Sequence, residues 1–284
     1  MTDTETDGSL LVPLANPETA DRLLDSAIDI ARARSMRIVV LHVVEVPPQL
    51  PLSDGDSLLD DDGAEERLLE DAVDRIGDAG VAVDSRIRYA RDVATGIVGA
   101  VDDHDAETLL AGWRGRPRRR DIVLGSFLDR ILGGAPCDVI VKRIRRVSRD
   151  IDSILVPVSE GPHAELAVDT AGRIASERNA SVRLLYVIDS DASDSAEAEA
   201  ETLLADRASR LEGSAVDVES SVLQSDHVAG AITDETAHHD LTVLGATRDP
   251  FLRRKLVGSV AEGVGRSASS SVMLARKAET EAKR

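Results

Sequence analysis

Short apolar runs alternate with segments of helical periodicity along the whole chain. One run begins at Leu10 and another at Ile154, and each ends in a Val-Pro turn that leads into apolar residues at helical spacing. A longer apolar run follows in both places, over residues 38–44 and 182–188. Continuous apolar runs of strand length between amphipathic helices predict the buried strands of a parallel sheet.

The pattern occurs twice. Matching residues near the start of each half, such as Pro13 and Pro157, are 144 residues apart. Matching residues nearer the end of each half, such as Gly112 and Gly245, are 133 residues apart. Most of the difference falls in residues 47–63, which are rich in Pro and Asp and predict a loop. The remaining predicted elements are helices at 64–79, 92–103, 195–211 and 226–238, and strands at 81–89, 108–111, 139–141, 215–223, 241–244 and 272–274.

Each half therefore predicts an α/β fold with five parallel strands in an open sheet and helices on both faces. We expect one domain over residues 8–143, a second over 151–276, and a charged tail over 277–284. We also expect the two halves to pair around a pseudo-two-fold axis through their closing strands, with a homodimer of the whole chain as a further option.

Composition narrows the function classes. Aromatic residues make up 2% of the chain, and 52 Asp and Glu against 34 Lys and Arg give a net charge of −18. That charge argues against a nucleic-acid binder, which needs a basic face. Only four of the basic residues are Lys. An acid-rich, Lys-poor surface suits a halophilic cytoplasm, and an ordinary acidic protein from a GC-rich genome is the alternative.

The same composition predicts a cytoplasmic location. The single cysteine, Cys137, excludes an internal disulfide and fits a reducing compartment. The first residues are acidic and polar, unlike a signal peptide. No apolar run reaches the length of a membrane span.

A glycine motif follows the fourth predicted strand of the first half. Gly112 and Gly115 are followed, after nine residues, by Gly125 and Ser126. Glycines let backbone N–H groups approach a phosphate closely, and the free N–H groups at the start of a helix favour an anion. The Ser126 hydroxyl suits either a phosphate contact or a helix cap. In an open sheet, such a ligand lies at the carboxyl ends of the strands, where the strand order reverses.

This motif, together with the Val-Pro ending of the first strand, resembles the nucleotide-binding motif of the universal stress protein family in both halves. The resemblance implies ATP or another adenine nucleotide as ligand, with Mg²⁺ as a candidate companion ion. It implies that phosphates lie beside the glycine loop and that adenine and ribose lie beside the first two strands. The implied phosphate residues are Gly112, Gly115, Gly125 and Ser126, and the implied adenine and ribose residues are Pro13, Leu14, Ala15 and Val43. Arg114 and Arg116 are further candidates for the phosphate side because of their charge and their place beside the glycines.

Two departures from the family pattern weaken parts of this site. The acidic residue that the family usually places after the first strand is replaced by Ala15 and, in the second half, by Ser159. The second half also has Arg248 where the first has Gly115. We therefore expect a degenerate second site, consisting of Gly245, Gly258, Ser259 and Val187.

Five arginines lie between residues 114 and 120, in an otherwise acidic chain. They suit a clamp on an anionic ligand, a solvated loop paired with acidic surface, or contact with acidic lipid or a membrane protein. The Gly-Trp-Arg-Gly-Arg-Pro segment resembles stress-protein domains appended to amino-acid and cation transporters. Trp113, Phe127 and Phe251 flank the two glycine loops, where they suit either stacking on a base or burial against the other half.

The chain has few signs of catalysis. It contains no P-loop motif, and His238 with His239 reads as the end of a helix rather than as a metal site. His42 is interpreted as a core residue. We expect no enzyme, or at most a weak ATP hydrolase. Two hypotheses remain, namely a nucleotide-sensing regulator, with a membrane transporter as one candidate partner, and an interaction scaffold that has lost its ligand.

Overall fold

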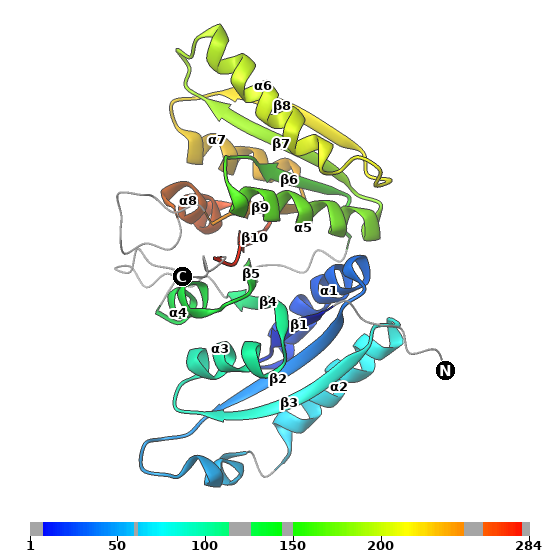
Figure 1. Ribbon diagram of the computed structural model, residues 1–284, viewed down its shortest axis with the longest axis vertical. Helices are drawn as coiled ribbons and strands as arrows, with labels where there is room; N and C mark the ends of the chain where they lie inside the picture. The colour runs from blue at the N-terminus through cyan, green and yellow to red at the C-terminus, as the bar shows by residue number, and fades with distance from the viewer. Residues whose placement is uncertain (1–7, 60–61, 114–125, 144–149, 247–257, 280–284) are drawn as a thin grey trace, which may run out of the picture. The chain divides into compact units, whose positions relative to one another are not determined.

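A computed structural model describes residues 8–59, 62–113, 126–143, 150–246 and 258–279. The chain divides into two compact units, one formed mainly by residues before Val141 together with Ala278 and Glu279, and the other mainly by residues 141–277. Each unit is an α/β domain (Figure 1).

The first half contains one open sheet with the strand order β3-β2-β1-β4-β5. The pairs β1–β2, β1–β4 and β2–β3 are parallel, as predicted. Its elements are β1 (Ser9–Pro13), α1 (Pro17–Arg34), β2 (Arg37–Glu45), the 3-10 helix η1 (Leu52–Leu58), α2 (Ala64–Asp78), β3 (Val83–Ala90), α3 (Val93–Asp103), β4 (Ala106–Trp113), α4 (Ser126–Gly134) and β5 (Asp138–Arg143).

The second half repeats this order as β10-β9-β6-β7-β8. The β6–β7, β6–β9, β7–β8 and β9–β10 pairs are again parallel. Its elements are β6 (Ser153–Pro157), α5 (Pro162–Arg178), β7 (Ser181–Ile188), α6 (Asp194–Ser209), β8 (Val218–Gln224), α7 (Val228–Glu235), the 3-10 helix η2 (Thr236–His238), β9 (Leu241–Gly245), α8 (Ser259–Ser267) and β10 (Ser271–Arg276).

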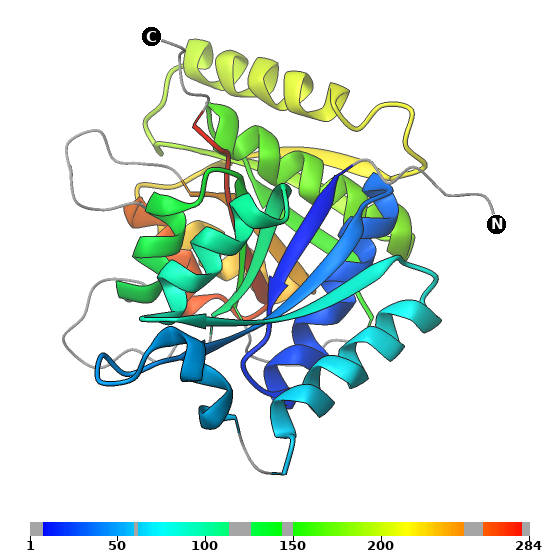
Figure 2. The same ribbon diagram turned by 60° about the horizontal axis from the view of Figure 1, so that its bottom comes forward.

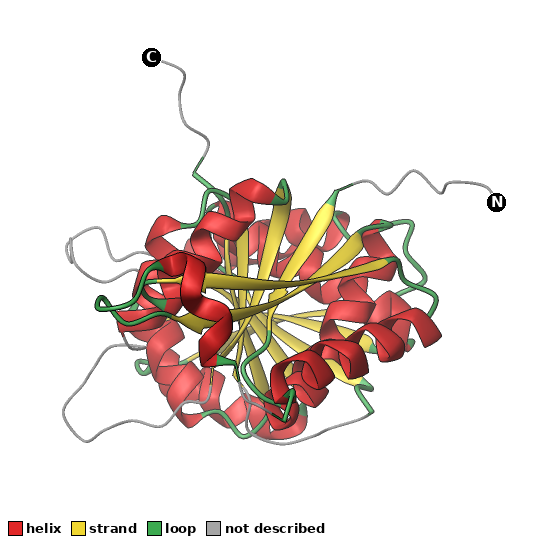
Figure 3. Ribbon diagram, turned by 90° about the horizontal axis from the view of Figure 1, so that it is seen from below, coloured by secondary structure: helices red, strands yellow, loops and turns green. Residues whose placement is uncertain are grey.

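Helices cover both faces of each sheet (Figure 3). In the first half, α1 and α2 contact each other on one face, and α3 and α4 contact each other on the opposite face (Figure 2). The central strands are almost fully buried, which explains their continuous apolar runs. The predicted fold of each half is thus confirmed, while the pseudo-two-fold pairing of the halves stays a prediction.

Local sequence signals set where the helices begin. Asn16 caps α1, and its side-chain oxygen accepts a hydrogen bond from the Thr19 backbone N–H at 3.0 Å. Pro17 follows at the first helical position, where a missing N–H costs nothing. Asp92 caps α3 in the same way, through the Thr95 backbone N–H at 3.0 Å. Both caps lie at the sheet edge where the strands end.

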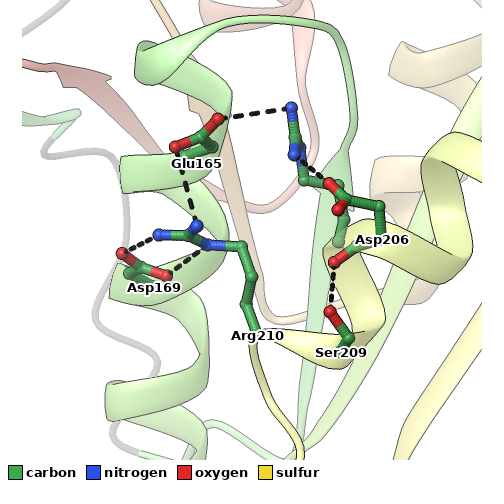
Figure 4. Close-up of polar contacts among 6 residues, drawn as sticks. Glu165, Asp169, Asp206, Ser209 and Arg210 are labelled. Carbon is green, nitrogen blue, oxygen red and sulfur yellow. Dashed lines mark hydrogen bonds and ion pairs between the residues drawn. The ribbon is translucent and has the colours of Figure 1, made fainter.

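The same ionic clamp joins neighbouring helices in both halves. Arg210, just after α6, contacts Asp169 through Nε at 2.9 Å and Nη2 at 2.8 Å, and Glu165 through Nη1 at 3.6 Å (Figure 4). The two carboxylates are four residues apart on α5, so they share one helix face. In the first half, Arg75 of α2 reaches Asp21 and Asp25 of α1, at 2.9 and 2.7 Å.

Candidate functional site

The first half contains a cavity of about 310 Å³ at the carboxyl ends of β1, β2 and β4. The strand order reverses between β1 and β4, so the cavity lies where open parallel sheets bind ligands. The residues that line it are Pro13, Leu14, Ala15, Thr19, Leu41, His42, Val43, Val93, Ile97, Ala111, Gly112 and Phe127. No lining residue that the structure describes carries a carboxylate. The cavity therefore suits an apolar, flat group rather than a cation.

Backbone and side-chain hydrogen bonds hold the strand ends around this cavity. The Leu14 N–H donates to the Leu41 carbonyl at 2.8 Å, which ties the loop after β1 to β2. The Leu14 carbonyl accepts a hydrogen bond from Nδ1 of His42 at 2.9 Å. The Thr19 hydroxyl donates to the Asn16 side chain at 2.9 Å. These bonds shape the cavity before any ligand arrives.

Helices α3 and α4 form a wall of the cavity. A Cβ on Gly96 of α3 would lie 2.7 Å from the Val43 side chain, so a glycine allows the helix to approach β2 closely. Asp92 joins the two helices, because it caps α3 and pairs with Arg130 of α4 at 3.0 Å. The hydrogen bonds from Thr95 and the charge of Arg130 hold the pKa of Asp92 below the usual range.

The second half contains an equivalent cavity of about 370 Å³. It lies at the carboxyl ends of β6, β7 and β9, again beside two helices. The residues that line it are Pro157, Val158, Ser159, Leu185, Tyr186, Val187, Val228, Ile232, Leu244, Gly245, Gly258, Ser259, Val260 and Ala261. None of these residues, all of which the structure describes, is charged.

The model of the universal stress protein family matches residues 8–143 and 150–276. These two matches cover most of the chain and coincide with the two α/β halves. The chain belongs to the universal stress protein family.

Comparison with known proteins agrees with a tandem universal stress protein. A curated relative is the Na(+)/H(+) antiporter NhaS5 of Synechocystis sp., which is 25% identical over 268 residues, or 94% of this chain. The chain spans only 38% of that relative. Within the described part of the chain, no helix has the length and apolar character needed to cross a membrane.

Solved structures share the fold over nearly the full length. A universal stress protein from Archaeoglobus fulgidus DSM 4304 has a TM-score of 0.69 at 18% identity, covering 96% of this chain and 97% of that one. The cytoplasmic domain of a prokaryotic cation chloride cotransporter has a TM-score of 0.65 at 15% identity, covering 95% and 96%. At these identities, the likeness concerns the fold.

The structure brings together the residues expected on the adenine side of the first universal stress protein domain. Pro13, Leu14, Ala15 and Val43 all line its cavity. On the phosphate side, Gly112 lines the cavity and Ser126 is the first residue of α4. Gly115, Gly125, Arg114 and Arg116 lie outside the described residues, as do the other arginines of the basic loop. Phe127 lines the cavity in its own half, while Phe251 lies outside the described residues.

All four residues assigned to the degenerate second site also line one cavity. Gly258 precedes α8 with an extended backbone, and Ser259 begins that helix. Gly245 has an additional role. A Cβ there would lie 2.8 Å from backbone atoms of His163 and Ala164, so the glycine lets the start of α5 pack against the end of β9.

Sequence reasoning missed part of each cavity wall. His42, interpreted as a core residue, lines the first cavity, and Tyr186 lines the second at the equivalent position. The 144-residue repeat is the signal that pairs these two residues. Ile97 and Ile232, on α3 and α7, face the cavities in the same way, but helical periodicity alone does not distinguish a cavity wall from a core position.

Other titratable groups lie away from the cavities. His238 ends η2 and His239 follows it, as predicted for a helix end. Burial and the Arg183 charge lower the pKa of His239, so the neutral ring is favoured. In the described residues, no three His, Cys, Asp or Glu side chains gather in a way that could hold a metal ion.

Proposed function

We propose that this universal stress protein is a non-enzymatic regulator that binds ATP or a related adenine nucleotide, mainly in its first half. One observation carries the proposal. A preformed apolar cavity lies at the carboxyl ends of β1, β2 and β4, and the first turn of α4 borders it through Phe127. A flat base fits such a cavity, and phosphates fit the free N–H groups at a helix start.

The residues around the cavity suit the two ends of a nucleotide. The apolar side chains of Leu14, Val43 and Ile97 offer contact area to a base. The Gly112 end of the cavity leads along the chain to Arg114 and Arg116, whose guanidinium groups suit phosphate oxygens. Mg²⁺ would then be bound by the phosphates rather than by protein carboxylates, since the described lining has none.

Binding without turnover is the simplest chemistry for this lining. Phosphoryl transfer needs a positioned base or a metal held by the protein. The described lining offers a histidine, the hydroxyl group of Thr19 and backbone groups, and no carboxylate. We therefore propose a sensor that changes its contacts with a partner when the nucleotide binds, with weak ATP hydrolysis as the most catalysis it would support.

A membrane transporter is our proposed class of partner. Support comes from the similarity to the Na(+)/H(+) antiporter NhaS5, of which this chain matches a part. We further propose that the protein acts in a cytoplasm of high salt concentration, which its net charge of −18 and its four lysines support.

Calorimetry with matched cavity-filling variants tests the nucleotide proposal. Ala15 is exposed and Ser159 half-buried, and each lines one cavity at the equivalent position. ATP, ADP and AMP would be titrated at high salt into the wild type, Ala15→Trp, Ser159→Trp and Gly125→Asp. We expect one site per chain that Ala15→Trp and Gly125→Asp abolish and that Ser159→Trp leaves intact.

A nucleotide-free interaction scaffold is the second candidate function. The replacement of the expected acidic residue by Ala15 and Ser159 favours it, because alanine has no hydrogen-bonding side chain and serine offers a single neutral hydroxyl in place of a carboxylate. No heat with any of the three nucleotides, from folded protein, would reject the sensor and support the scaffold.

A further inference from the structure

The two cavities correspond position by position. Equivalent residues are 144 positions apart at the ends of β1 and β6 and of β2 and β7. They are 135 positions apart on helices α3 and α7, and 133 apart on β4 and β9 and on α4 and α8. The pairs are Pro13 and Pro157, Leu14 and Val158, Ala15 and Ser159, Leu41 and Leu185, His42 and Tyr186, Val43 and Val187, Val93 and Val228, Ile97 and Ile232, Ala111 and Leu244, Gly112 and Gly245, and Phe127 and Val260. Most pairs are alike in chemistry, so a difference in specificity must come from the few that are not.

His42 and Tyr186 form the one pair of this set in which both side chains are able to make hydrogen bonds. His42 donates from Nδ1 to the Leu14 carbonyl at 2.9 Å. Because a carbonyl oxygen only accepts, this bond places a proton on Nδ1. Nε2 of the neutral ring then has no proton, and no described residue contacts it through a hydrogen bond. In this tautomer the ring, which lines the cavity, offers a ligand one acceptor and no donor.

Tyr186 differs from His42 because its side chain can both donate and accept a hydrogen bond. Its hydroxyl makes no hydrogen bond to any described residue. The Ser159 and Ser259 hydroxyls of the same cavity are likewise free of partners among the described residues. The second cavity can therefore satisfy a ligand donor or a ligand acceptor at this point.

We propose that His42 makes the first half selective for a ligand that places an N–H donor against its Nε2, as an amino-substituted purine does. Tyr186, at the equivalent position of the second half, imposes no such requirement. This inference rests on the proposed nucleotide function and names the group that reads the base. A base that lacks the amino group leaves Nε2 buried and unpaired beneath the ligand, which costs affinity.

The test compares ATP with purine riboside 5′-triphosphate, which differs by the absence of the amino group. Calorimetry on the wild type should give an affinity for ATP about threefold to tenfold higher, the range for one hydrogen bond. In His42→Phe the ratio should fall to about one, because the ring stays and the acceptor is lost. Tyr186→Phe is the matched control and should leave the first-half ratio unchanged.

Each result bears on one of the two proposals. Equal affinities of ATP and the analogue for the wild type would overturn the role of His42 while the nucleotide function stands. Binding of neither compound would overturn both. The wild-type comparison needs no variant, so equal affinities overturn the role of His42 even if thermal unfolding shows that His42→Phe does not fold. A preference for ATP that persists in folded His42→Phe would overturn it as well, because another group would then contact the amino group.

Discussion

At the residue scale, two glycines differ in what surrounds them. Gly245 ends β9, where an added Cβ would lie 2.8 Å from the backbone of α5. Gly77 lies in α2, with no atom within 4 Å of an added Cβ. We expect Gly245→Ala to lower the free energy of unfolding by about 1–3 kcal/mol, because backbone atoms cannot move aside cheaply. Urea unfolding followed by circular dichroism would measure it.

Gly77→Ala is the control for this prediction and should have the opposite sign. Alanine loses less backbone entropy than glycine on forming a helix, and nothing obstructs its methyl group. We expect the free energy of unfolding to rise by about 0.5–1 kcal/mol. A Gly245→Ala variant as stable as the wild type would show that the start of α5 does not depend on this close approach.

The glycine motif illustrates what sequence spacing can predict for a single residue. The spacing placed Gly112 and Gly245 at the end of the fourth strand of each half, and both line cavities there. The spacing could not predict that Gly245 also makes room for α5. That contact joins positions 82 residues apart in the sequence, and it depends on how the helix packs on the sheet.

At the element scale, the first half has a segment that the second lacks. Residues 47–63 predict a loop, and within them the structure has the 3-10 helix η1, which packs on β3. A Cβ on Gly55 would lie 2.3 Å from the Tyr89 ring. Arg91 donates to the carbonyls of Pro47 and Leu50 at 2.6 and 2.8 Å. Because these contacts come from residues more than 30 positions away, local periodicity could not predict them.

The titration of Tyr89 should show whether η1 packs against β3 in solution. Burial, and the hydrogen bond and charge of Asp56, raise its pKa from 10.0 to about 12. The folded state thus favours the neutral phenol, so its contribution to stability is complete below pH 10 and is lost as the pH rises toward 12. An ultraviolet absorbance titration of phenolate formation should show this late step, and Tyr89→Phe should remove it.

The Asp56→Asn variant distinguishes the two causes of the raised pKa of Tyr89, the Asp56 carboxylate and burial of the ring. The amide removes the negative charge, so the late step should move to lower pH while the ring stays against Gly55. An unchanged titration in Asp56→Asn would mean that Asp56 does not contact the phenol in solution. An absence of any late step in the wild type would mean that η1 does not cover Tyr89.

At the scale of the whole molecule, the repeat was the most informative sequence feature. It predicted that both halves share one α/β fold with parallel strands and that each has a candidate ligand site at the carboxyl ends of its strands, because the same apolar pattern recurs at nearly constant separation. It also points to the second ionic clamp once the first is known, since Asp21 and Glu165 differ by the same 144 residues. The partner arginines, Arg75 and Arg210, are 135 residues apart, the same separation as the equivalent residues of α3 and α7, so the repeat pairs them as well.

Net charge is the other property of the whole chain with a measurable consequence. With 52 acidic and 34 basic residues, carboxylates repel one another over long distances at low ionic strength. The screening length falls from about 10 Å at 0.1 M salt to about 3 Å at 1 M. We expect KCl to raise the unfolding temperature, and a gain of about 1 kcal/mol corresponds to roughly 2–4 °C in a chain of this size.

Helix α6 offers a control for this salt effect. Glu197, Glu199 and Glu201 are exposed on it, and they lie apart from the clamp at its end. Replacing all three with Gln removes three negative charges and leaves the buried face unchanged. This variant should unfold at a higher temperature than the wild type at 0.1 M KCl, and the difference should shrink at 2 M, because salt then screens the same repulsion. A wild type that loses stability in KCl would show instead that the ionic clamps, which salt weakens, outweigh the repulsion.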